Sequence, residues 1–381
     1  MPIYKTNGKK DGLQKYNVRI NYTGDNGKAK QLTRTAYGLE AAKDLERSLI
    51  LEMKNKGENS VKKMTVQRLY EEYTNVRKYE LRETSIRINR QLYELYIQPI
   101  MENVQLTKLS TAMLQRWKLT VEERNLAPAT KKKAYSAFRA ILNYAVHMEY
   151  IPRNPILKVG NFINAFETDK KTELVFYTAQ EFMRYISAAK QAAEERQKKY
   201  NDMSEWDFYV FFNIAFYTGL RKGEIHALKW SDMSGALLSV TRSIAQKLQG
   251  ADRETPPKNK SSVRTLQIPL PLMKILNEHK LRQQQLEHFT DDCRICGCTR
   301  SLRDSTLFVK NINYATKAGL KPIKIHGFRH SHVSLLANEG INIQEIARRL
   351  GHAKVEETWN TYSHLYPREE EKAVDILNKI A

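Results

Sequence analysis

The sequence predicts a multidomain protein that is mainly α-helical with small β-sheets, and three observations support this prediction. The chain has 381 residues, which is the length of two or three domains. Alternating polar and apolar residues near the N-terminus predict a small sheet, whereas most of the remainder follows the helical period. Hydrophobic residues make up 41% of the chain, which is enough to build a core in each part. We therefore expect an N-terminal sheet-plus-helix module, an all-α domain and an α+β domain, in that order.

Residues 12–37 have the pattern of a β-hairpin. Apolar side chains recur at every second position of the first strand: Tyr16, Val18, Ile20 and Tyr22. The Asn-Gly pair at 26–27 supplies turn chemistry before a second strand. The amphipathic stretch 39–53 predicts a helix, and the polar segment 54–63 predicts a linker. A basic sheet with one helix suits either a DNA-binding module or an ordinary capping subdomain, and the pattern leaves both open.

The next segment, up to residue 150, follows the helical period. Four helices are expected, over residues 64–80, 84–99, 110–124 and 128–148. Pro128 suits the first turn of the last helix, where its missing N–H leaves no hydrogen bond unmade. The apolar stripe of that helix is expected to be core and consists of Tyr135, Phe138, Ile141, Leu142 and Ala145. Residues 151–175 lack periodicity and predict an interdomain linker.

The remainder of the chain mixes helical and strand patterns. Thr178 and Glu181 form the spacing of a capping box, which predicts where the first helix begins. Further helical patterns complete the following set: 178–198, 205–217, 271–287, 304–317, 327–339 and 342–350. Strands are expected at 236–244 and 263–268, joined by a polar turn. This mixture predicts an α+β domain.

Positive charge is spread over the whole chain. Lys and Arg total 63 against 42 Asp and Glu, a net charge of +21. Each part of the chain has a basic excess, which favours a polyanionic partner, with nucleic acid ahead of an anionic membrane surface. No apolar run is long enough to span a bilayer, and the N-terminus lacks the apolar core of a secretory signal. We expect a protein of a reducing compartment.

The three cysteines lie together in the string CRICGC. Cys293, Cys296 and Cys298, with His288 nearby, have a spacing that a zinc site could use. The sequence has no second Cys-x-x-Cys pair, so reduced, partly exposed thiols are the favoured interpretation and no metal is expected.

Four stretches of the third part carry an unusual set of polar residues. The stretches are TGLRKGEIHALKW, PPKNKSSVRTLQIP, HGFRHSHVSLL and LGHAKVEETWNTYSHLYP. Their candidate functional residues, in chain order, are Arg221, Lys258, His326, Arg329, His352 and Tyr362. Each residue alone has an ordinary explanation as a capping, turn, surface or core side chain. The ordered set is specific, because several independent matches occur at compatible spacing.

This ordered set closely resembles the catalytic signature of the tyrosine recombinases, the phage integrase family of phages and integrative conjugative elements. The helical segment with NLAPATKKKAYSAFRAILNYAVHMEYIPRNP resembles the core-binding domain of that family, and the N-terminal sheet with its helix resembles an arm-binding domain. The resemblance implies an arm-type DNA-binding domain at 1–58 and a core-binding domain at 62–150. A linker at 151–175 and a tyrosine recombinase catalytic domain with a C-terminal tail at 176–381 would follow.

The resemblance also implies a role for each residue of the set. Arg221 and Arg329 would clamp the nonbridging oxygens of a DNA phosphate, and His352 would complete the pocket. Tyr362 would attack the phosphorus to form a 3′-phosphotyrosyl link, with His326 as the acceptor of its proton. Such a clamp needs no metal, and no cofactor is expected because the link to tyrosine stores the energy of the broken bond.

The leaving 5′-hydroxyl needs a proton, and Lys258 in the polar turn would supply it as general acid, with Lys260 as the alternative. Tyr366 is expected to pack in the core. His330 and His332 are expected to be helix residues near the site without a catalytic role.

The expected function is a site-specific DNA recombinase, an integrase that integrates and excises a mobile element. Its expected partners are double-stranded DNA at core and arm sites and three further copies in a tetramer on DNA, with no membrane. An excision factor and a host DNA-bending protein are further candidates, and the expected location is the cytoplasm, at the nucleoid. A DNA-binding regulator and a type IB topoisomerase-like enzyme are the alternatives. The amphipathic tail 368–381 would dock on a neighbouring protomer, as the resemblance implies, or on its own domain.

Overall fold

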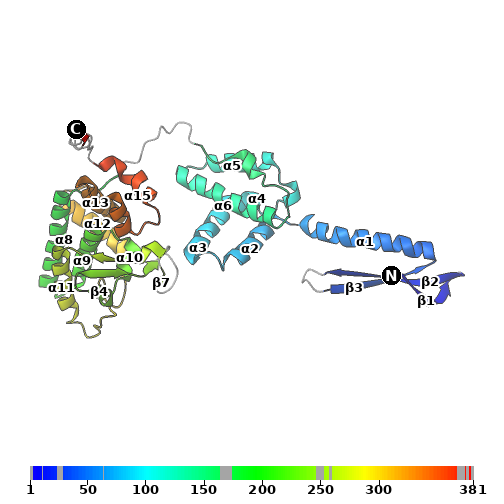
Figure 1. The fold of residues 1–381 in the computed structure, drawn as a ribbon, viewed down its shortest axis with the longest axis horizontal. Helices are drawn as coiled ribbons and strands as arrows, with labels where there is room; N and C mark the ends of the chain where they lie inside the picture. Colours follow the sequence, from blue (N-terminus) through cyan, green and yellow to red (C-terminus); the bar gives the residue numbers. More distant parts are fainter. Residues whose placement is uncertain are drawn as a thin grey trace. The chain divides into compact units, whose positions relative to one another are not determined.

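The computed structural model describes residues 3–10, 12–23, 29–62, 64–163, 174–245, 253–256 and 260–366, and residues 374, 377 and 378 of the tail. The chain divides into two units, Met1–Thr168 and Asp169–Ala381. Figure 1 shows the sheet-plus-helix module, the helical segment and the C-terminal unit, each with the class of structure expected from the sequence.

Three antiparallel strands form the N-terminal sheet in the order β1-β2-β3: β1 (Ile3–Lys10), β2 (Leu13–Thr23) and β3 (Ala29–Tyr37). The expected hairpin is β2–β3; its turn at 24–28 lies outside the described residues, and β1 is an additional strand. Buried Val18, Ala36, Ala42 and Leu49 form a small core between the sheet and α1 (Leu39–Lys62).

The linker expected at 54–63 is wrong, because α1 continues through it to Lys62. This stretch is polar, but four of its ten residues are Lys, which has good helix propensity. Its single Gly57 costs about 1 kcal/mol relative to Ala, which does not outweigh the rest of a long helix. Polarity alone therefore does not indicate irregular structure.

The four helices expected in the next segment are confirmed as α2 (Val66–Arg77), α3 (Glu83–Leu92), α5 (Thr111–Glu122) and α6 (Pro128–His147). The second is interrupted by a π-turn at Tyr93–Ile97 before the short α4 (Gln98–Met101). Pro99 has no N–H to donate to the carbonyl of Leu95, which instead accepts a hydrogen bond from Arg124 at 2.7 Å. The stripe of α6 is buried as expected.

The linker expected at 151–175 is wrong for its first half. Ile151, Ile156 and Phe162 are buried in the core of the helical segment, and Ile156 begins the short helix α7 (Ile156–Val159). Lys118 donates hydrogen bonds to three successive carbonyls, those of residues 159–161. Isolated apolar residues with irregular spacing have no period to detect, so their burial was not predictable. Residues 164–173 lie outside the described part of the chain.

The C-terminal unit is built around α9 (Ser204–Thr218), which is buried on nearly every side. The capping box of Thr178 and Glu181 begins α8 (Ala179–Tyr200) as expected. The other helices are α10 (Lys222–Ala227), α11 (Leu270–Gln283), α12 (Asp304–Lys317), α13 (Ile325–Asn338), α14 (Ile343–Leu350) and α15 (Val355–Tyr362). The last of these was not expected from the sequence.

Two small sheets accompany these helices. One has the order β4-β5-β8, with β4 (Met233–Ser234), β5 (Leu237–Val240) and β8 (Arg264–Gln267). The other pairs β6 (Ser243–Ala245) with β7 (Arg253–Thr255). The single strand expected at 236–244 is therefore divided between both sheets.

The cysteines are free and buried, so the expected partial exposure is wrong. Cys293 and Cys296 are 5% and 0% exposed and belong to the core of the C-terminal unit. Burial raises the pKa of the Cys296 thiol. In the described part of the chain, no group of three or more His, Cys, Asp or Glu side chains is arranged to hold a metal ion.

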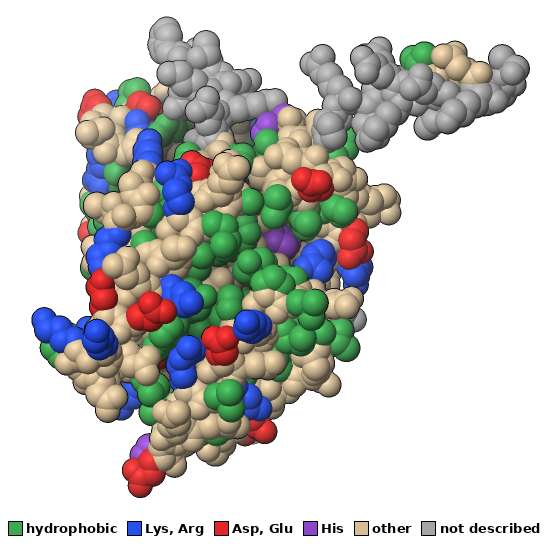
Figure 2. Space-filling view, turned by 90° about the vertical axis from the view of Figure 1, so that its left-hand side faces the viewer, with side chains coloured by type: hydrophobic (Ala, Val, Ile, Leu, Met, Phe, Trp, Pro, Cys, Tyr) green, Lys and Arg blue, Asp and Glu red, His purple; other side chains and the backbone are tan. Residues whose placement is uncertain are grey.

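The surface carries charges of both signs. On the face shown in Figure 2, Lys and Arg side chains lie among Asp and Glu, with hydrophobic side chains gathered between them. The excess positive charge is therefore not concentrated on that face. Among the described helices, none combines the length and the hydropathy that crossing a membrane requires.

Candidate active site

A tight turn after α9 positions the first candidate, Arg221. Gly219 ends α9 with φ of +65° in the left-handed region, and a Cβ there would lie 2.7 Å from a ring carbon of His332. Only glycine fits this position without strain. Arg221 then occupies the N-cap of α10, with 39% of its side chain exposed. The turn thus holds one cationic side chain at the surface of a buried helix end.

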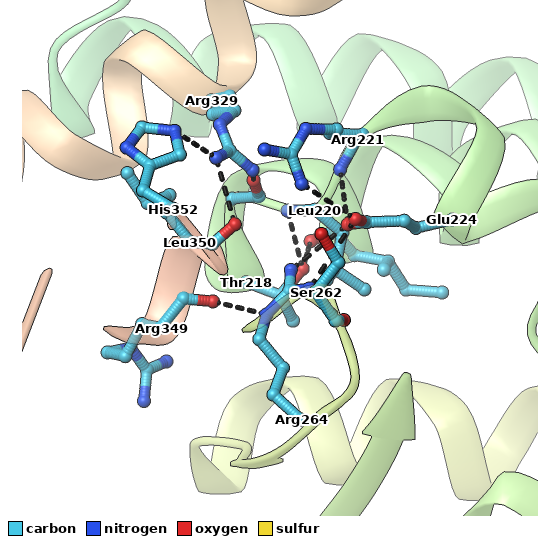
Figure 3. Close-up of polar contacts among 12 residues, drawn as sticks. Thr218, Leu220, Arg221, Glu224, Ser262, Arg264, Arg329, Arg349, Leu350 and His352 are labelled. Atoms are coloured by element: carbon cyan, nitrogen blue, oxygen red, sulfur yellow. Dashed lines mark hydrogen bonds and ion pairs between the residues drawn. The ribbon is translucent and has the colours of Figure 1, made fainter. Parts of the chain in front are cut away.

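Glu224, one turn into α10, joins two arginines (Figure 3). Its carboxylate accepts a hydrogen bond from the Arg221 guanidinium at 2.9 Å and from Arg264 at 3.0 Å. Arg264 belongs to β8, and it also donates to the backbone carbonyls of Ser262 and Arg349. Burial alone would raise the pKa of Glu224, but the charge and hydrogen bonds of Arg264 and Arg221 outweigh it and lower the pKa. Glu224 is therefore an anion that fixes the position of Arg221.

Arg329 lies in the second turn of α13 and is 2% exposed. It donates to the carbonyls of Gly219 and Leu350, at 2.8 and 2.9 Å. A further N–H meets Nε2 of His352 at 2.7 Å, and Nδ1 of His352 lies 2.8 Å from the hydroxyl of Thr358. Because an arginine only donates, Nε2 of His352 accepts and its Nδ1–H donates to Thr358. Among the described residues, no carboxylate contacts Arg329 directly, so backbone carbonyls and His352 hold it.

The electrostatics of this cluster favour an anion. Burial and the neighbouring Arg221 lower the pKa of Arg329 to about 9, so the side chain still carries its charge at neutral pH. Burial and the charges of Arg329 and Arg221 lower the pKa of His352 to about 4. Figure 3 shows the guanidinium groups of Arg221 and Arg329 beside one another, with His352 next to Arg329. A phosphate placed here would relieve their mutual repulsion and accept hydrogen bonds from both.

Tyr362 lies at the end of α15 and is 3% exposed. It packs against Val333 and Leu350, and its hydroxyl lies 2.7 Å from Nδ1 of His330. Burial raises the pKa of Tyr362 to about 12, against a smaller lowering effect from Arg329. The phenol is therefore protonated at neutral pH and is a weak nucleophile unless its proton is removed. Tyr366 packs in the same cluster, as expected, and donates to the carbonyl of Ile341 at 2.9 Å.

His326 and His330 face each other one turn apart on α13. Their ring centroids are 4.8 Å apart and the rings are perpendicular. His326 is exposed, and partial desolvation and the charges of Arg329 and Arg221 lower its pKa. The pKa of His330 is lowered to about 4, mainly by burial and in addition by electrostatic repulsion from His326 and Arg329. Both imidazoles are therefore neutral at physiological pH.

His332 has a structural position, with Nδ1 2.9 Å from the carbonyl of Phe216. Lys258 lies outside the described residues. Lys260 begins the 3₁₀ turn Lys260–Ser262, and nothing is described of its side chain. The choice between the two lysines therefore stays a prediction.

The structure thus brings together Arg221, Arg329, His352, Tyr362 and, at the exposed edge, His326, from segments far apart in the chain. Sequence reasoning missed Glu224 and the contact of His330. Both had a signal in their spacing: Glu224 follows Arg221 by three residues, as in a capping box, and His330 follows His326 by four, which places both on one helix face.

Two known domain families match most of this chain. Residues 176–369 match the phage integrase family, and residues 49–161 match the phage integrase SAM-like domain. The ICEBs1 integrase of Bacillus subtilis is 32% identical over 265 residues, which cover 68% of this chain and 67% of that protein. A XerC-like tyrosine recombinase of Caldanaerobacter subterraneus is 26% identical, over 71% of each chain.

Solved structures share the fold. An integrase of the Tn1549 transposon, in complex with a circular intermediate DNA, has a TM-score of 0.65 at 18% identity and covers 84% of this chain and 100% of its own. A lambda integrase tetramer bound to a Holliday junction has a TM-score of 0.56 at 16% identity, over 93% and 96% of the two chains. The chain belongs to the phage integrase family. It is a tyrosine-type site-specific DNA recombinase, an integrase, as the ordered residues of its sequence predicted.

Proposed function

We propose that Arg221, Arg329 and His352 bind the scissile phosphate of a DNA strand and that Tyr362 attacks its phosphorus. The observation that supports this most directly is the pair of guanidinium groups beside His352, where no carboxylate of the described part of the chain contacts the buried Arg329. Glu224 holds Arg221 by its side, so the clamp is formed before DNA arrives. Preorganised donors of this kind stabilise charge that develops in a transition state.

The reaction exchanges one phosphodiester for another. The phenol oxygen of Tyr362 forms a bond to phosphorus while the bond from phosphorus to the 5′-oxygen breaks. The phenol loses its proton, and the leaving 5′-oxygen gains one, for which Lys258 is the proposed general acid and Lys260 the alternative. A 5′-hydroxyl of a second strand reverses the step, so that strands are exchanged without ATP. By resemblance, His326 remains the predicted acceptor of the phenol proton.

The proposed partners follow from the relatives. The structures of the Tn1549 and lambda integrases contain DNA, and one lambda integrase structure is a tetramer on a Holliday junction. We propose that four copies of this chain act on core sites in DNA and that the N-terminal sheet binds separate arm sites. An excision factor and a host DNA-bending protein would control the direction of recombination, and the place of action would be the nucleoid.

Covalent trapping tests the nucleophile. The protein is incubated with a nicked duplex from the attachment site of its own element, in EDTA without ATP, and a protein–DNA adduct is sought on a denaturing gel. We expect an adduct with the wild type and with Tyr366→Phe, and none with Tyr362→Phe. Tyr366→Phe is the matched control, because it removes a phenol hydroxyl from the same apolar cluster. Specific DNA binding without an adduct from any of the three proteins would contradict the proposal.

A further inference from the structure

The hydroxyl of the proposed nucleophile has one imidazole within hydrogen-bonding distance in the described structure, and it belongs to His330. Nδ1 of His330 lies 2.7 Å from the oxygen of Tyr362, a short distance for a hydrogen bond. The two rings lie 5.6 Å apart between centroids. His326 is at the exposed start of α13, and its described contact is with the ring of His330. The imidazole that contacts the reacting oxygen is therefore not the one that the ordered motif indicates.

The protonation states leave one proton on the phenol and one on the imidazole. A pKa of about 12 keeps the phenol of Tyr362 protonated, and a pKa of about 4 keeps His330 neutral. With the ring proton on Nε2, Nδ1 accepts the phenol O–H, whereas the other tautomer would donate from Nδ1 to the phenol oxygen. The tautomer protonated at Nε2 is the one that a proton acceptor for the phenol requires.

The chemical need for such a group is large. At pH 7 a phenol with a pKa of about 12 is ionised in roughly one molecule in 10⁵, so attack by free phenolate would be very slow. The charge of Arg329 lowers the pKa of the phenol only in part. A neutral base in contact with the phenol removes the proton as the new bond forms, and an ordinary general base contributes about 10²–10⁴-fold.

We propose that His330 is a catalytic residue of this integrase, the general base that takes the proton of Tyr362 as the phenol oxygen attacks the DNA phosphorus. The O–H bond of Tyr362 breaks, the proton passes to Nδ1 of His330, and the oxygen–phosphorus bond forms while the 5′-oxygen leaves with a proton from the general acid. In ligation His330 returns the proton to the phenol. This inference rests on Tyr362 being the nucleophile.

The imidazolium formed in this step lies next to the charges that the reaction creates. Arg329 lies close enough to His330 for its charge to lower the pKa of the imidazole. The negative charge of a phosphate held by Arg329 would offset this repulsion when the imidazolium forms. His326, at i − 4 on the same face, contacts the ring of His330 from the exposed start of α13.

The test compares single-turnover rates of adduct formation for matched substitutions one helical turn apart. His330→Asn places an amide oxygen at the δ position, so it can still accept a hydrogen bond from the phenol but cannot take its proton. His330→Ala removes both functions, and His326→Asn is the same change on the neighbouring ring. Each variant is first shown to bind the attachment-site duplex and to unfold at the same midpoint as the wild type.

We expect both His330 variants to form the adduct about 10²–10⁴-fold more slowly, His330→Asn included, and both to slow ligation as well. Added imidazole should restore part of the rate of His330→Ala. On a substrate with sulfur as the bridging leaving atom, which departs without a proton, the defect of His330→Asn should persist while that of Lys258→Ala disappears. His326→Asn should slow adduct formation less than the two His330 variants do.

Other outcomes would overturn the inference. Faster adduct formation by His330→Ala than by the wild type would show that the His330 side chain holds the phenol in an inactive position. A wild-type rate in His330→Asn with a large loss in His326→Asn would assign the base to His326. Recovery of the His330 variants on the sulfur substrate would place the defect at the leaving group. If the wild type forms an adduct and Tyr362→Phe does not, Tyr362 is the nucleophile, whichever of these results is obtained for the base.

Discussion

Replacing Glu224 with Gln tests whether one buried carboxylate organises the arginines of the proposed active site. Glu224 is 4% exposed and Arg264 is 6% exposed, so this ion pair is removed from water. Each carboxylate oxygen of Glu224 accepts from Arg221: Oε1 from the guanidinium at 2.9 Å and Oε2 from the backbone N–H at 3.0 Å. Arg264 contacts both oxygens. A glutamine offers one oxygen, and its NH₂ group would then face donors.

The expected cost follows from this count. Losing two charge-assisted hydrogen bonds, at about 1.5–3 kcal/mol each, gives about 3–6 kcal/mol. Breaking a buried ion pair by removing one partner typically costs about 3–5 kcal/mol, which agrees. Arg264 keeps its bonds to the carbonyls of Ser262 and Arg349, so we expect the lower part of this range. Arg221 also loses its fixed position, so we expect slower adduct formation as well as lower stability.

Urea unfolding of the full chain, followed by tryptophan fluorescence, measures this change. Three of the four tryptophans, Trp206, Trp230 and Trp359, belong to the C-terminal unit, so the signal reports mainly on it. Glu345→Gln is the matched control, because Glu345 pairs with Arg348 at the surface, where such pairs contribute little. If the two glutamine variants unfold at the same urea concentration, the assignment of Glu224 as an organising anion is refuted.

Three further predictions concern stability and DNA binding. Gly219→Ala should destabilise it by more than Gly235→Ala: both glycines have positive φ, a strain of about 1–2 kcal/mol for alanine, but only at Gly219 would the Cβ meet His332. Equal urea midpoints for the two alanine variants would contradict this. The pKa of Glu224 is lowered on folding from 4.5, so its contribution is present above about pH 4.5 and is lost as the pH falls. The difference in free energy of unfolding between wild type and Glu224→Gln should therefore shrink as the pH falls. A difference that grows in acid would contradict the predicted direction. DNA affinity should fall steeply and log-linearly with salt concentration because of the net charge of +21, whereas a salt-independent dissociation constant would speak against phosphate-dominated binding.

Local signals in the sequence predicted most of the elements. The four helices of the helical segment and the start of α8 at a capping box follow from periodicity and caps, which operate within a few residues. Where a segment gave weak local signals, the prediction was wrong. The polar residues 54–63 predict a linker but end α1, and the segment 151–175 predicts another linker although Ile151, Ile156 and Phe162 are buried. Both errors confuse a lack of apolar periodicity with a lack of structure.

The candidate residues of the site could be recognised before folding was considered, because the ordered arginines, histidines and tyrosine match the signature of a known family. How these residues are held depends on the packing of separate elements. Glu224 meets Arg264 from a strand 40 residues away, and His330 meets Tyr362 across 32 residues. Hydrogen bonds and buried ion pairs depend on distances of about 3 Å between side chains, and chain folding alone sets those distances for residues on different elements. The partner of the phenol could therefore be identified only when α13 and α15 were packed together.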